Sequence, residues 1–196
     1  PFELISSSAP VSKAFGNRYN IALDDLSSSV LIFESAHLEN LVIRKTVSFS
    51  QDSFIINHHI EIKKNKNAIS SVGLVWDKGL RNTEQNIQDE ISYSLSSVGI
   101  NKKIENITLT PTSISDVVEE KLYDNVDWAA IRNKYFIMAL VPASSVRASH
   151  SSSAFMLNNA TLVPSYSASI NSINSSELDC DLFLGPLDVD EINKLD

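Results

Sequence analysis

The histidines of this sequence are the side chains best suited to acid–base or metal chemistry near neutral pH. There are four of them: His37, His58, His59 and His150. His58 and His59 are neighbours in a run where apolar and polar residues alternate, so a strand would direct them to opposite faces of a sheet. They therefore cannot both bind one metal ion from a regular strand. His58 shares the register of Ile56 and Ile60. We interpret it as a histidine packed in the core, with an acid, base or ligand role as the alternative.

A pair of carboxylates near the C-terminus is the second candidate for chemistry. Asp179 and Asp181 flank Cys180 and would share one face of a strand, where paired carboxylates can exchange protons or bind calcium. We interpret them as a solvent-facing alternation, with Cys180 turned towards the core. Because Cys180 is the only cysteine, an intrachain disulfide is excluded and no Cys/His zinc site is expected.

The sequence lacks the local motifs that mark common enzymes and cofactor sites. It contains no G-x-G-x-x-G, no G-x-x-x-x-G-K, no G-x-S-x-G and no H-E-x-x-H motif. It carries 24 acidic and 16 basic residues, a formal net charge of −8, without a long run of Lys and Arg. A nucleic-acid-binding protein needs a basic surface to neutralise phosphates. We therefore expect no nucleic-acid partner, and neither a cofactor nor a metal ion.

Period-two alternation of apolar and polar residues dominates the elements that would position these side chains. It runs through Leu41–Phe49 and again through Phe54–Ile62, with a short polar turn between them. This pattern predicts an antiparallel hairpin with one buried face, and Ile69–Trp76 predicts a third strand. Further strands are expected at Val30–Phe33, Glu90–Leu95, Lys103–Leu109, Lys134–Val141, Ala154–Leu157, Ala160–Val163 and Leu178–Leu184.

Many short strands separated by polar turns predict a mostly β fold, an antiparallel sandwich. Helical patterning is sparse, and residues 115–122 are ambiguous between helix and strand. The clearest helix is C-terminal, where Val189, Ile192 and Leu195 share one face. It follows Pro186, and acidic residues occupy its first turn, where they complement the helix dipole.

The chain reads as one domain taken from a longer protein. It begins at Pro1, without an initiator methionine or the pattern of a signal peptide. Its longest apolar stretch, Tyr135–Ala143, is far shorter than the roughly 20 residues of a membrane span. No linker divides the sequence, so we expect a single domain over residues 1–196.

Three segments resemble a known bacterial family. In residues 126–142 a tryptophan leads into a strand with a Tyr-Phe pair that ends at a proline, and residues 182–186 form an aromatic strand ending in Gly-Pro. A Lys-Thr pair lies in the first strand of the expected hairpin. The matching positions are Lys45, Thr46, Trp128, Tyr135, Phe136, Pro142, Gly185 and Pro186. Their order and spacing resemble the large periplasmic domain of the YidC-type bacterial membrane protein insertases.

The resemblance implies a β-supersandwich, similar in architecture to galactose-mutarotase-like enzymes, with a short C-terminal helix. It implies a non-catalytic domain excised from between the first and second membrane helices of its parent, on the periplasmic side of the bacterial inner membrane. The implied partners are the membrane core of the parent insertase, components of the Sec translocon and nascent membrane proteins. Val189, Ile192 and Leu195 would contact a partner.

The aromatic residues of these segments also have a purely structural interpretation. Trp128, Tyr135 and Phe136 would anchor the sandwich core, because each can bury a large apolar area. Two other functions stay open. One is a mutarotase-like sugar enzyme of the periplasm, with a histidine acid and a carboxylate base. The other is a carbohydrate- or peptide-binding β-sandwich outside any insertase.

Overall fold

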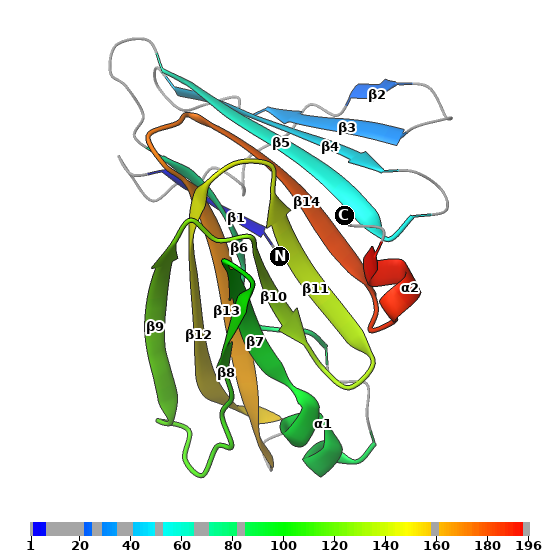
Figure 1. Ribbon diagram of the computed structural model, residues 1–196, viewed down its shortest axis with the longest axis vertical. Helices are drawn as coiled ribbons and strands as arrows, with labels where there is room; N and C mark the ends of the chain where they lie inside the picture. Colours follow the sequence, from blue (N-terminus) through cyan, green and yellow to red (C-terminus); the bar gives the residue numbers. More distant parts are fainter. Residues whose placement is uncertain are drawn as a thin grey trace.

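A computed structural model of the chain describes residues 2–6, 22–24, 29–34, 41–49, 53–64, 71–81, 85–157 and 161–193. Two antiparallel sheets pack against each other, and two short helices lie at the margins (Figure 1). The mostly β, antiparallel sandwich expected from the alternation is confirmed. Of the candidate functional residues named above, His37 and Leu195 lie outside the described residues.

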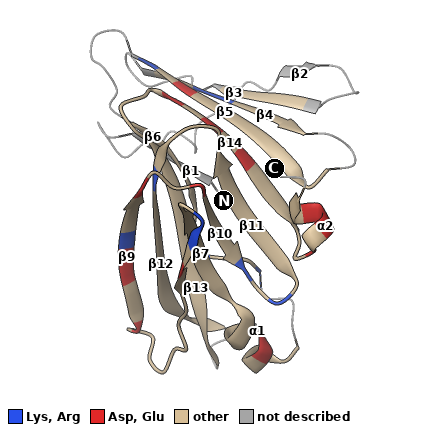
Figure 2. Cartoon of the chain, viewed as in Figure 1, with Lys and Arg blue, Asp and Glu red and all other residues tan. Residues whose placement is uncertain are grey.

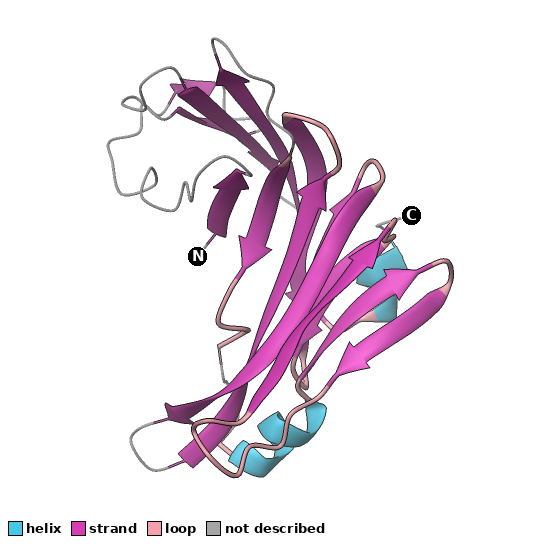
Figure 3. Ribbon diagram, turned by 90° about the vertical axis from the view of Figure 1, so that its left-hand side faces the viewer, coloured by secondary structure: helices cyan, strands magenta, loops and turns pink. Residues whose placement is uncertain are grey.

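In the described part of the chain, the larger sheet has nine strands and the smaller sheet has five, and they form two layers when the molecule is seen from the side (Figure 3). In spatial order the larger sheet contains β2 (Ala22–Asp24), β3 (Ser29–Glu34), β4 (Leu41–Phe49), β5 (Ile55–Lys64), β14 (Glu177–Pro186), β11 (Phe136–Pro142), β10 (Trp128–Arg132), β7 (Leu95–Ile100) and β8 (Lys103–Ile107). The smaller sheet contains β1 (Phe2–Ser6), β6 (Val72–Trp76), β13 (Thr161–Ser172), β12 (Val146–Leu157) and β9 (Val117–Asp124).

The main core lies between the two sheets. Alternation places every second residue of a strand on this inner side. On β11 the inward residues Met138 and Leu140 are fully buried, and Leu182 of β14 lies opposite Leu140. Ile170 of β13 joins the same cluster from the smaller sheet.

The predicted hairpin is confirmed as β4 and β5, with Val47 opposite His58. β14 pairs with the other side of β5 and places Cys180 opposite His58. Cys180 is buried and Asp179 is exposed, as the alternation predicted. The sequence alone did not reveal that Cys180 and His58 are neighbours, because more than a hundred residues separate them in the chain.

The expected third strand exists, but it does not extend the hairpin. It begins at Val72 and belongs to the smaller sheet, where β6 pairs with β1 and β13. Alternation reports that a segment is extended, whereas the identity of its neighbour depends on contacts far away in the chain. Most of the ambiguous segment 115–122 is strand, since β9 begins at Val117. It forms the edge of the same sheet.

The strand expected at Glu90–Leu95 is wrong. Helix α1 (Ile87–Tyr93) occupies most of that segment, and β7 begins at Leu95. The backbone amide of Gln88 donates to the side chain of Asn86 at 3.1 Å, which satisfies one free N–H at the start of the helix. Asp89 then accepts a hydrogen bond from Lys134 and holds the helix against the turn after β10.

The segment 126–142 forms two strands, although only the second was expected. β10 ends at Arg132, and the side chain of Asn133 accepts hydrogen bonds from the amides of Tyr135 and Phe136 in the turn before β11. The strands expected at 154–157 and 160–163 are parts of β12 and β13, which are twelve residues each. Four serines of these strands are buried, Ser149, Ser152, Ser169 and Ser172, and Ser149 and Ser169 hydrogen-bond across the two strands at 2.8 Å.

The expected C-terminal helix is present as α2 (Val189–Ile192). The carboxylate of Asp188 accepts hydrogen bonds from the amides of Asp190 and Glu191, so it caps the helix. Among the described residues, no helix has the length and apolar character needed to cross a membrane.

Candidate functional site

A second apolar cluster covers part of the outer face of the larger sheet, the face turned away from the smaller sheet. Its buried members are Ala130, Ala139 and Phe183, and the partly buried members are Ile55, Trp128, Ile137, Val141 and Ile192. We call this set the outer cluster. It arises because β14, β11 and β10 carry apolar residues on both faces, which is unusual for a sheet face that meets water. Ile192 joins it from α2, so the C-terminal helix lies on this face.

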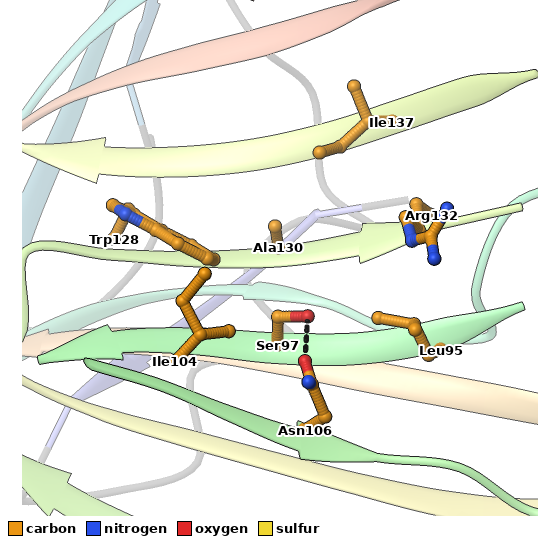
Figure 4. Close-up of a pocket in the computed structure, with 8 residues that line it drawn as sticks. All are labelled: Leu95, Ser97, Ile104, Asn106, Trp128, Ala130, Arg132 and Ile137. Carbon is orange, nitrogen blue, oxygen red and sulfur yellow. Dashed lines mark hydrogen bonds between the residues drawn. The ribbon is translucent and has the colours of Figure 1, made fainter. Parts of the chain in front are cut away.

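A shallow cavity of about 270 Å³ extends the outer cluster towards the edge of the sheet. Its lining comes from β7, β8, β10 and β11, and consists of Leu95, Ser97, Ile104, Asn106, Trp128, Ala130, Arg132 and Ile137 (Figure 4). Strand register explains the set, because Ala130 lies opposite Ser97 and Ser97 lies opposite Asn106. The cavity is mostly apolar, with a few polar groups, as in sites that bind peptides or small molecules.

Trp128 closes one end of this cavity. The residue opposite it on β7 is Gly99, and the indole lies directly over that glycine. A Cβ atom at position 99 would meet Trp128 Cε2 at 2.4 Å, so any other residue there would push the indole away. Trp128 is only partly buried, and it packs against the outer cluster rather than in the core between the two sheets.

The polar lining of the cavity provides hydrogen-bonding groups and one positive charge. Ser97 Oγ donates to Asn106 Oδ1 at 2.6 Å, and Arg132 lies at the end opposite Trp128 (Figure 4). Within the described part of the chain, the Arg132 guanidinium has no carboxylate partner. This end of the cavity therefore suits an acidic or carbonyl group of a ligand.

Polar pairs border the outer cluster on the side of β5. His59 Nδ1 lies 2.6 Å from Asp179 Oδ1, and Asn57 Nδ2 donates to Asp181 Oδ1 at 2.6 Å. Thr46 lies opposite His59 in the same cross-strand row. The structure thus pairs a histidine with a carboxylate, the two kinds of group that a mutarotase-like enzyme was expected to use.

The inner side of the same strands holds buried polar groups. Burial lowers the pKa of Lys45 to about 8, and it raises the pKa of Cys180 to about 12. Burial, together with the smaller effect of the nearby Lys45 charge, lowers the pKa of His58 to about 4. His58 is therefore neutral and packed at neutral pH, as interpreted from its register. The described residues contain no group of three or more His, Cys, Asp or Glu that could hold a metal ion.

Among the described residues, His150 is the second buried histidine. It lies on β12 with its ring edge-on to Tyr123, 5.4 Å between centroids. Burial lowers its pKa to about 4, and Lys121 contributes in the same direction. The hydrophobic core thus contains two histidines that stay uncharged near pH 7.

The remaining positions of the family resemblance divide into structural and exposed ones. Gly185 is buried, and an added Cβ would meet Phe54 and Phe183, whose rings pack edge to face at 6.2 Å. The interpretation of Tyr135 and Phe136 as core anchors is wrong, because 47% and 44% of their surface is exposed. They lie at the turn into β11, with Lys134 Nζ 5.2 Å from the centre of the Tyr135 ring.

Sequence reasoning missed most of the cavity. Leu95, Ser97, Ile104, Asn106 and Arg132 belong to three strands, and no local motif connects them. The sequence signal that could have located it was the pairing of Gly99 with Trp128, but reading it requires knowledge of which strands pair. Figure 2 shows acidic residues on α1, α2 and β14 and both signs on β9, so charge alone does not mark the cavity.

The chain is similar to known proteins in sequence and in fold. It is 28% identical over 163 residues to a membrane protein insertase YidC of Chlorobium phaeovibrioides, covering 78% of this chain and 27% of that protein. It is 26% identical over 155 residues to a membrane protein insertase YidC of Chlorobium limicola, covering 76% and 26%.

A heparan sulfate lyase, HepC of Pedobacter heparinus, has a similar fold, with a TM-score of 0.53 at 6% identity, over 94% of this chain and 24% of the lyase. At this identity the similarity concerns the fold alone, and it agrees with the expected supersandwich. A model of the YidC periplasmic domain matches residues 12–196, and the chain therefore belongs to that family.

Proposed function

We propose that this domain is a non-catalytic interaction domain of an inner-membrane protein insertase, which helps the insertase to insert and fold membrane proteins, alone or with the Sec translocon. The outer cluster carries this proposal. It presents apolar side chains on a sheet face turned away from the main core, next to a cavity and bordered by polar pairs. An apolar face that is only partly covered and has a polar rim is typical of protein interaction sites.

The family places the domain on the periplasmic side of the bacterial inner membrane, as expected. The chain spans about a quarter of the length of the curated relatives, 27% in one of them. We propose that residues 1–196 form a single domain between the first and second membrane helices of a longer parent. The membrane core of that parent is then the first partner, and Sec components and nascent membrane proteins are further partners.

Helix α2 supports contact with the membrane core. Ile192 packs onto the outer cluster, whereas Val189 leaves 71% of its surface exposed. One side chain thus attaches the helix to the sheet, and the other is available to a partner. We propose Val189 and Leu195 as contact positions, and Ile192 as the residue that holds Val189 in place on the sheet.

Carbohydrate binding is the second candidate function. Asp179, Asp181, Asn57 and His59 form a row of hydrogen-bonding groups beside the partly buried apolar side chains of the outer cluster. Sugars are commonly bound by such planar polar groups next to an apolar surface. A nuclear magnetic resonance titration with neutral mono- and disaccharides tests this role, and saturable shifts at His59 and Asn57 would favour it.

Site-specific photo-crosslinking in the full-length insertase, in membrane vesicles, tests the first proposal. A photoreactive residue at Val189 should give adducts with the membrane core of the parent or with another membrane protein. The matched control is Leu122, which is 64% exposed on β9 of the smaller sheet and far from the outer cluster in the fold. Equal adducts from both positions, or none from Val189, would contradict the proposal.

A further inference from the structure

Strand β8 is an edge strand whose surface is open. In the described part of the chain it pairs with β7 alone. Lys103, Ile104, Glu105 and Asn106 are all exposed, and Ile104 leaves 60% of its surface accessible. An exposed edge presents unpaired backbone groups, to which another extended chain can add.

The turn between β7 and β8 determines which backbone groups point outwards. Asn101 and Lys102 both have positive φ, 49° and 66°, as in the two-residue turns that join antiparallel strands. Such a turn makes Ile100 and Lys103 a hydrogen-bonded pair, so the next pair, Gly99 and Ile104, is not hydrogen-bonded.

An observed hydrogen bond agrees with this alternation. The carbonyl of Gly99 accepts from the amide of Asp127, on the β10 side, at 2.8 Å. The backbone groups of Gly99 therefore point away from β8, and those of Ile104 point away from β7. The same alternation directs the N–H and C=O groups of Asn106 to the open edge.

The smaller sheet extends beyond this edge by one strand. β8 lies over β12, and β9 continues the smaller sheet on the far side of β12 (Figure 1). Val118 and Tyr123 of β9 face inwards and remain only partly buried. A strand added next to β8 would therefore lie above β9 and would extend the larger sheet as far as the smaller one.

We propose that this open edge binds an extended segment of another protein, which adds to the larger sheet as a tenth strand above β9. On the outer face its central side chain would lie beside Ile104 and be apolar. On the inner face its neighbours would be Lys103 and Glu105, which form no ion pair within the described residues. An antiparallel segment with a basic residue opposite Glu105 and an acidic residue opposite Lys103 complements both charges.

This inference goes beyond the proposed function, because it concerns a different edge of the domain and does not depend on contact through α2. Failure of the crosslinks from Val189 would leave it intact, and its own failure would leave the outer cluster as an interaction site. The two tests therefore report on separate surfaces.

The experiment uses a short synthetic peptide that alternates apolar and polar residues, with a lysine before and a glutamate after a central isoleucine. Hydrogen exchange of the chain is followed with and without about 1 mM peptide. The exchange of the Ile104 and Asn106 amides should slow by about tenfold, because added-strand hydrogen bonds protect them. The amides of Lys103 and Glu105 already face β7 and should change little.

Two controls make the result specific. A peptide with proline in place of the central isoleucine should have no effect, because it lacks the central N–H. The variant Ile104→Pro removes an N–H that points away from β7, so it should keep its unfolding midpoint and lose the protection at Asn106. In Glu105→Lys the protection should fall severalfold and return with a peptide whose lysine is replaced by glutamate. Equal protection by the proline peptide, or none with the original peptide, would overturn the proposal.

Discussion

Replacement of the buried His150 should change how the stability of the domain depends on pH. Burial lowers the pKa of this side chain to about 4, against about 6.5 in an unfolded chain. Between these two values the unfolded state binds a proton that the folded state does not bind. The free energy of unfolding therefore falls as the pH falls from about 6.5 towards 4, and it is unaffected by this group above pH 7.

The size of the effect follows from the two pKa values. The full difference between the two pKa values corresponds to about 3 kcal/mol, reached below pH 4. At about pH 5 the unfolded histidine is almost fully protonated and the folded one is mostly neutral, so His150 alone removes about 2 kcal/mol of stability relative to about pH 7.5.

Urea unfolding of the wild type and of His150→Leu, each at about pH 7.5 and pH 5, measures this difference. Leucine has a similar volume and does not titrate, so the variant should lose about 2 kcal/mol less than the wild type between the two pH values. Carboxylates and His58 contribute equally to both proteins and cancel in the comparison. The reasoning is refuted if both proteins lose the same stability on acidification.

Three other substitutions test the remaining contacts. Gly99→Ala should displace the Trp128 indole and lower the free energy of unfolding by about 1–3 kcal/mol, and an unchanged urea midpoint would show that the ring can move freely. Ile192→Asp should detach α2 from the outer cluster, seen as faster proteolysis of the C-terminus with the sandwich still folded. If this variant unfolds the whole domain, Ile192 is instead part of the core. Between about pH 8 and pH 10.4, Lys45 is neutral in the folded state and charged in the unfolded state, so the wild type gains stability as the pH rises. Lys45→Met should remove this gain. A gain that persists in the variant would contradict the lowered pKa.

The local features of the fold could be predicted from the sequence. Alternation through Leu41–Phe49 and Phe54–Ile62 predicted the hairpin and the opposite orientations of His58 and His59, and the alternation around Cys180 predicted the exposure of Asp179. The acidic residues after Pro186 predicted a helix there, and Asp188 caps it. These features follow from one residue and its near neighbours, because side-chain direction along a strand and capping at a helix end are local properties.

Only the tertiary structure decided where those elements pair and which apolar side chains meet water. It assigned β6 to the smaller sheet, assembled the cavity of Leu95 and Arg132 from separate strands, and left Phe136 exposed. It also extended β9 beyond the open edge of β8. A strand with apolar residues on both faces has the same local pattern whether its second face is covered or open, because coverage depends on segments far away in the chain.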